Sequence, residues 1–104
     1  MRHKPQSLFT PPSPGKVLRR YIVEGEGVTQ DDLAVAMKVS RLTVNQIIND
    51  KRTVTAEMAL RLARVLHTTP EFWLDLQRGT DLYKARRALA AKLDKMPVLR
   101  RPAA

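Results

Sequence analysis

The side chains with the most recognisable chemistry gather in one short stretch near the middle of the chain. There, arginine, threonine and amide side chains stand between spaced apolar residues. Such side chains pair with base edges in the DNA major groove. An ordinary surface helix carries mostly Lys, Glu and Ala instead. The pattern therefore predicts a DNA-reading surface with five base-reading residues: Arg41, Leu42, Thr43, Asn45 and Gln46.

The expected contacts follow from the geometry of base edges. Arg41 should bond a guanine, Asn45 or Gln46 an adenine, and Leu42 should meet a thymine methyl group. Contacts to phosphates should fix the register of the helix on the duplex, aided by the dipoles at two helix N-termini. The residues expected to hold phosphates flank the same stretch: Gln30, Ser40, Asn49, Lys51 and Arg52.

Residues 29–52 predict the two short helices and tight turn that would position these side chains. Thr29 is a good N-cap, and Asp32, three residues later, completes a capping-box-like pair. Ser40 offers a second N-cap. Lys38 stands in the turn, where a left-handed backbone costs about 1 kcal/mol or a little more. Apolar residues recur at helical spacing and should face inward: Leu33, Ala34 and Met37, then Val44, Ile47 and Ile48.

The rest of the chain predicts three more helices and no strand. A flexible arm is expected over residues 1–12, a domain over residues 13–95 and a basic tail over residues 96–104. Ser13 followed by Pro14 starts a helix, Thr55 caps another over residues 56–66, and Thr69 followed by Pro70 starts the last. The sequence Gly-Thr-Asp at 79–81 suggests a bend or restart. One apolar cluster should lie in the core or at a dimer interface: Phe72, Trp73 and Leu76.

Composition limits the remaining possibilities. The chain has 104 residues and a net charge of +9, and seven basic against two acidic side chains fall in residues 80–104. Such basic ends suit a polyanionic partner, although a solvated tail explains each end about equally well. The absence of cysteine suits a reducing cytoplasm. No apolar run approaches the roughly eighteen residues of a membrane span, and no signal peptide is expected.

An enzyme is not expected. Catalysis needs an activated nucleophile, a paired acid and base, or a metal. His3 lies in the arm, and His67 stands alone at a helix end, where it complements the helix dipole. No catalytic residue, metal site or cofactor is therefore predicted. A helical adaptor for protein or RNA is a less favoured alternative, because the aromatic platforms that bind single strands are missing.

Two resemblances sharpen this reading. Residues 29–52 resemble the helix-turn-helix of the phage-repressor (XRE-like) class. The segments PGKVL (14–18), TAEMALRLARVL (55–66) and above all TPEFWLDLQ (69–77), followed by DLYKAR, resemble the HigA-type antitoxins of toxin–antitoxin operons. The chain departs from that family with Ser13 and Lys16 where His and Glu are usual. It also has Lys38, Asp50 and His67 at helix ends where the family has Gly.

The resemblance implies an all-α, five-helix phage-repressor-like (lambda repressor-like) DNA-binding domain with a C-terminal helical extension. It implies a homodimer bound to a palindromic operator on double-stranded DNA, and no membrane. It also implies a RelE/HigB-like toxin partner, a ribosome-dependent mRNA endonuclease that the antitoxin neutralises. The expected location is the bacterial cytoplasm, on the nucleoid when the operator is bound. A stand-alone XRE-family repressor without a toxin is the main alternative.

Overall fold

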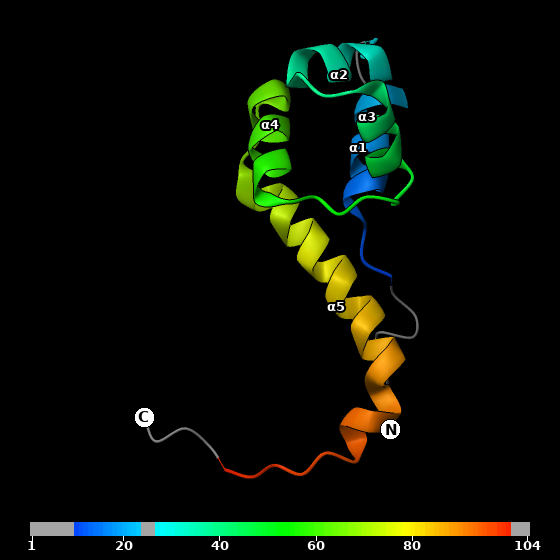
Figure 1. The fold of residues 1–104 in the computed structure, drawn as a ribbon, viewed down its shortest axis with the longest axis vertical. Helices are drawn as coiled ribbons and strands as arrows, with labels where there is room; N and C mark the ends of the chain where they lie inside the picture. Colours follow the sequence, from blue (N-terminus) through cyan, green and yellow to red (C-terminus); the bar gives the residue numbers. More distant parts are fainter. Residues whose placement is uncertain (1–9, 24–26, 101–104) are drawn as a thin grey trace.

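The computed structural model describes residues 10–23 and 27–100. Most of the predicted arm and the last four residues of the predicted tail lie outside these ranges. Within them the chain forms five α-helices and no strand (Figure 1): α1 (Pro14–Val23), α2 (Gln30–Met37), α3 (Arg41–Ile48), α4 (Ala56–Leu66) and α5 (Pro70–Asp94). The all-α, five-helix prediction is confirmed. No described helix is long and apolar enough to cross a membrane.

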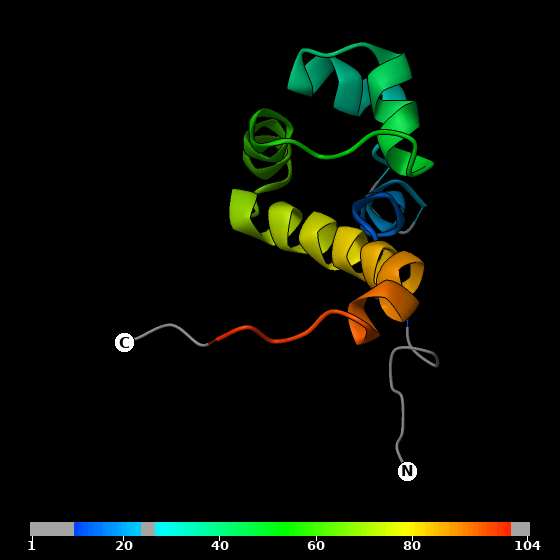
Figure 2. The same ribbon diagram turned by 60° about the horizontal axis from the view of Figure 1, so that its bottom comes forward.

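Each helix contributes at least one large, fully buried side chain to a single core. Apolar side chains recur every three or four residues, so each helix has one face to bury. The helices pack in a closed ring, in which each helix contacts two others. α2 packs against α3 and α4, α1 packs against α3 and α5, and α4 packs against α5. Figure 2 shows α5 running beneath α4 and then α1. The largest fully buried side chains are Leu18, Leu33, Val44, Ile47, Val54, Leu62 and Trp73.

Trp73 belongs to this core. Its ring lies 6.1 Å from the ring of Tyr21 and meets Phe72 edge-on at 5.1 Å. Its indole Nε1–H donates a hydrogen bond to the Thr68 hydroxyl at 2.7 Å. Leu76 is half-buried and packs against the same core, whereas Phe72 is exposed. Of the two roles predicted for this cluster, the structure therefore shows the core role for Trp73.

Three helices are followed within two residues by a left-handed residue that is not glycine. Lys38, Asp50 and His67 have φ angles of 61°, 57° and 59°. After each of them, the next backbone N–H returns to a carbonyl five residues earlier, at 3.0, 2.7 and 3.0 Å respectively. These bonds satisfy carbonyl groups that the helix end leaves free. The strained turn predicted at Lys38 is thus present, and it occurs at all three helix ends.

The bend predicted at residues 79–81 is wrong, because α5 continues unbroken through Gly79. Gln77 and Asp81 span this point, with the Gln77 amide donating to the Asp81 carboxylate at 2.9 Å. Gly79 lies beside Pro11, in the segment that leads into α1. These contacts support the helix where its own sequence is weak. The C-terminal half of α5 then extends away from the other four helices (Figure 1).

Candidate DNA-binding surface

Two helix caps fix the geometry of the α2–turn–α3 unit. The Thr29 hydroxyl accepts a hydrogen bond from the Asp32 backbone N–H, and the Asp32 carboxylate accepts one from the Thr29 N–H, both at 3.0 Å. The Ser40 hydroxyl accepts from the Thr43 N–H at 3.0 Å and starts α3. Both predicted N-caps are therefore confirmed. They set where each helix begins, and hence which side chains face outward.

The two faces of α3 divide as the sequence predicted. Its apolar residues Val44, Ile47 and Ile48 are buried. Leu42, by contrast, is 63% exposed, which is unusual for a leucine and leaves it free to meet an apolar group of a ligand. The five predicted base-reading residues all lie on α3: Arg41, Leu42 and Asn45 are exposed, and Thr43 and Gln46 are half-buried. Their contacts with DNA stay predictions.

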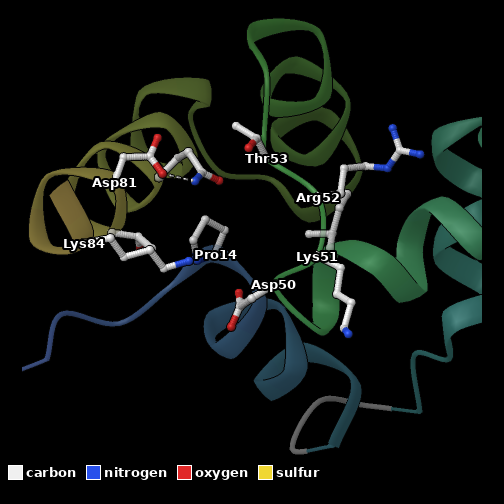
Figure 3. Close-up of a pocket in the computed structure, with 10 residues that line it drawn as sticks. Pro14, Asp50, Lys51, Arg52, Thr53, Asp81 and Lys84 are labelled. Carbon is white, nitrogen blue, oxygen red and sulfur yellow. Dashed lines mark hydrogen bonds between the residues drawn. The ribbon is translucent and has the colours of Figure 1, made fainter. Parts of the chain in front are cut away.

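The predicted phosphate-binding residues surround this face. Gln30 is the first residue of α2, and Ser40 is the N-cap of α3. Asn49, Lys51 and Arg52 follow the end of α3 and are exposed. Figure 3 shows Lys51 and Arg52 pointing in different directions from the loop. Ser40 and the last three residues thus lie at the two ends of α3, whereas Gln30 lies beside Asn45 in the middle of that helix.

Three of the predicted base-reading residues contact a side chain from outside α3. The Arg41 guanidinium lies 3.3 Å from the Asp31 carboxylate. The Asn45 amide donates to the Gln30 side chain at 3.4 Å. The Arg52 Nε–H donates to the Gln46 side-chain oxygen at 3.0 Å. Side chains restrained in this way lose less conformational entropy on binding.

Sequence reasoning missed three residues around this unit. One of them is Asp31, whose contact with Arg41 the sequence did not indicate. Arg19 of α1 donates to the Ile48 carbonyl and to the Asn49 side chain, both at 3.2 Å, and so caps the end of α3. Arg61 of α4 donates to the Met37 carbonyl at the end of α2. These bonds join residues ten to thirty positions apart, so no local pattern signals them.

A polar pocket of about 160 Å³ separates the loop after α3 from α5 (Figure 3). The Val54 backbone N–H donates to the Gln77 side chain across this region at 2.8 Å. Figure 3 shows the Lys84 amine and the Asp50 carboxylate near Pro14. The pocket therefore lies where the loop after α3 meets α1 and α5.

A capped turn between two short helices, the second with an exposed polar face, defines a DNA-binding helix-turn-helix domain of the phage-repressor type. The comparison with family models supports this class. The chain belongs to the HTH_3 helix-turn-helix family, whose model matches residues 18–73.

HigA antitoxins are among the proteins that this chain resembles. Antitoxin HigA-1 of Vibrio cholerae serotype O1 is 43% identical over 76 residues, which cover 73% of this chain and 71% of that protein. The structure of a HigA-family addiction module antidote protein from Coxiella burnetii has a TM-score of 0.82 and 33% identity, covering 88% of this chain and 100% of that one. Pseudomonas aeruginosa antitoxin HigA with the higBA promoter has a TM-score of 0.79 and 34% identity, covering 86% and 99%.

Proposed function

We propose that this chain is the DNA-binding antitoxin of a HigBA-type system: it represses its own operon and neutralises a RelE-like toxin. The observation that carries the DNA-binding part is the outer face of α3. It exposes an arginine and amides over a buried apolar face, on a fold similar to an antitoxin solved with its promoter. The toxin part rests on the similarity to HigA antitoxins.

In the proposed complex, each subunit lays α3 in the major groove. Arg41 pairs with a guanine, Asn45 or Gln46 with an adenine, and Leu42 with a thymine methyl. The phosphates on either side are held from the start of α2 and from the loop after α3. A single α3 buries too little surface for tight specific binding, so two copies are needed.

The distal half of α5 offers a surface for the second copy. Leu82, Leu89 and Leu93 are 43%, 39% and 45% exposed, and their spacing of seven and four residues places them on one side of the helix. This half of α5 extends away from the other helices (Figure 1). Pairing of two such stripes would bury apolar surface that water otherwise solvates. We therefore propose a homodimer through α5, which requires a palindromic operator.

The toxin should bind a surface other than the outer face of α3, because that face is mostly polar. The double substitution of Arg41 and Gln46 by Ala should then abolish repression of a reporter fused to the operon's promoter. The same variant should still protect cells from the toxin encoded beside it. Arg78→Ala, which removes an exposed arginine from α5, should leave both activities intact.

Other outcomes would point to the alternatives. If the double variant is folded but loses both activities, the two binding surfaces overlap, and the separation proposed here is wrong. If the wild-type protein represses but protects against no neighbouring toxin, it is a stand-alone repressor. If its DNA affinity shows no steep dependence on salt, it is an adaptor rather than a DNA-binding protein.

A further inference from the structure

The residue that holds Arg41 is not part of the recognition helix. Asp31 belongs to the first turn of α2, and both of its carboxylate oxygens approach Nη1 of Arg41, at 3.3 and 3.4 Å. The two side chains are 67% and 65% exposed. Exposed ion pairs of this kind contribute little to folding stability. The contact between Asp31 and Arg41 therefore adds little to the stability of the fold, and we consider its effect on DNA binding instead.

Asp31 is also not needed to start α2. The capping box is formed by Thr29 and Asp32, whose carboxylate accepts the Thr29 N–H. Asp31 does add favourable negative charge at the helix N-terminus, but Asp32 supplies the same charge one residue later. The position of Asp31 is distinguished by its contact with Arg41.

That contact is unfavourable for general DNA affinity. The start of α2 faces the side of the molecule where phosphates are expected, and a carboxylate there repels them. It also offsets part of the charge of Arg41, which could otherwise contact any phosphate within reach. Removing one effective positive charge from the interface weakens binding to all sequences alike. A residue with this cost at a DNA-binding surface should serve specificity.

From this geometry we propose that Asp31 is a specificity-determining and positioning residue for base reading by Arg41. This inference rests on the proposed DNA-binding function. The hydrogen bond to Asp31 uses Nη1, which leaves the guanidinium edge formed by Nε and Nη2 for the two acceptors of a guanine. On a non-matching sequence, Asp31 competes with phosphates for the same arginine. Asp31 thus makes Arg41 respond to a base rather than to the backbone.

The test uses two duplexes and two neighbouring acids. The probes are a duplex selected from a randomised library by the wild-type protein, with each of its base pairs then varied singly, and a scrambled duplex of equal length. The variants are Asp31→Asn and the matched control Asp32→Asn. The control removes the same charge from the same helix turn but leaves Arg41 held. Circular dichroism confirms that both variants are folded at the assay temperature.

Asp31→Asn should tighten binding to the scrambled duplex by about 3- to 10-fold and steepen its log–log salt dependence by about one unit, because Arg41 is released to the phosphates. It should also lower discrimination by about 10-fold at the one base pair that Arg41 reads. Asp32→Asn should tighten both duplexes by a similar factor and leave discrimination unchanged. With Arg41→Ala already present, Asp31→Asn should have no more effect on the salt slope than Asp32→Asn has.

Equal effects of the two asparagine variants on base discrimination would overturn the proposal. So would a full effect of Asp31→Asn on the salt slope when Arg41 is absent. If the wild-type protein selects no duplex from the library, the proposed DNA-binding function fails as well. If it selects one and Asp31→Asn discriminates as the wild type does, only the role of Asp31 fails.

Discussion

The Ser13 hydroxyl donates a 3.0 Å hydrogen bond to the Asp50 carboxylate. The same hydroxyl accepts the Lys16 backbone N–H at 3.1 Å, so it caps α1 while it holds the residue that ends α3. Ser13 is buried, and Asp50 is left-handed. The Ser13 side chain therefore joins the start of α1 to the residue that follows the end of α3. Disturbing either residue should shift the other.

Because of this hydrogen bond, glycine should have a different effect on stability at Asp50 than at Lys38 and His67. Lys38→Gly and His67→Gly should each raise the denaturation midpoint slightly, because relief of strain of about 1 kcal/mol or more outweighs the added entropy of the unfolded chain. Asp50→Gly should instead destabilise the fold by about 1 kcal/mol, since it leaves the buried Ser13 hydroxyl without its charged acceptor. Urea unfolding of the three variants measures this. A higher midpoint for Asp50→Gly would show that the bond to Ser13 contributes less to stability than the backbone strain that glycine relieves.

Two glycines should respond oppositely to the same substitution. A Cβ at Gly15 would lie 2.5 Å from the Ile47 carbonyl and from an Asp50 oxygen, so Gly15→Ala should destabilise by about 1–3 kcal/mol. A Cβ at Gly79 would meet only Pro11, at 4.0 Å. Gly79→Ala should therefore stabilise α5, by up to about 1 kcal/mol. Thermal unfolding compares the two, and equal shifts would contradict the close approach of α1 to α3.

The indole N–H of the buried Trp73 donates its hydrogen bond to the Thr68 hydroxyl. Thr68→Val keeps the shape of the side chain but leaves the buried Nε1–H of Trp73 unpaired, which should cost about 1–3 kcal/mol. Thr53→Val is the control, because Thr53 is exposed and should change stability by no more than about 0.5 kcal/mol. Similar unfolding midpoints for the two variants would mean that the indole finds another partner.

If the protein dimerises through the leucine stripe of α5, a charge placed in that stripe should convert the dimer to a monomer. Leu89→Lys places a charge in the middle of the leucine stripe and should yield a monomer at micromolar concentration. Leu60→Lys makes the same change at an exposed leucine of α4, outside the stripe, and should leave the dimer intact. Sedimentation distinguishes these states. A wild-type monomer, or a dimer that survives Leu89→Lys, would exclude this interface.

Local sequence signals were enough to predict the elements of the fold. Thr29, Ser40, Thr55 and Thr69 act as helix caps where the sequence suggested them. The apolar spacing in α3 likewise separated its buried face from its exposed one. Such signals span only a few residues, and each is satisfied within its own helix.

Long-range contacts were not predictable in this way. The helix α5 continues through Gly79 despite the low helix propensity of glycine, and Pro11, from the segment before α1, lies beside it. The pairing of Asp31 with Arg41 depends on the path of the turn between their helices. Arg19 caps α3 from another helix, and no local sequence signal assigned it that role. Each of these features depends on how helices that are distant in the sequence pack together.

Binding of single-residue variants to the selected and scrambled duplexes tests the central claim, that α3 reads bases. Lys51→Ala should weaken binding to both duplexes alike and reduce the salt slope by about one unit, because Lys51 lies beyond α3 and should reach only the backbone. Val44→Ala is the folding control: Val44 is fully buried, so its cost of about 1–3 kcal/mol should appear in unfolding and not in recognition.

The decisive variant is Arg41→Ala. The account predicts that it weakens binding to the selected duplex by roughly 10- to 150-fold, the equivalent of about 1–3 kcal/mol, and relaxes preference at one base pair. Binding to the scrambled duplex should change far less, because we propose that Asp31 competes with the phosphates for Arg41 when no matching base is present. An equal loss of affinity for both duplexes would contradict the account. It would reduce Arg41 to a phosphate contact and move base reading to Asn45 and Gln46.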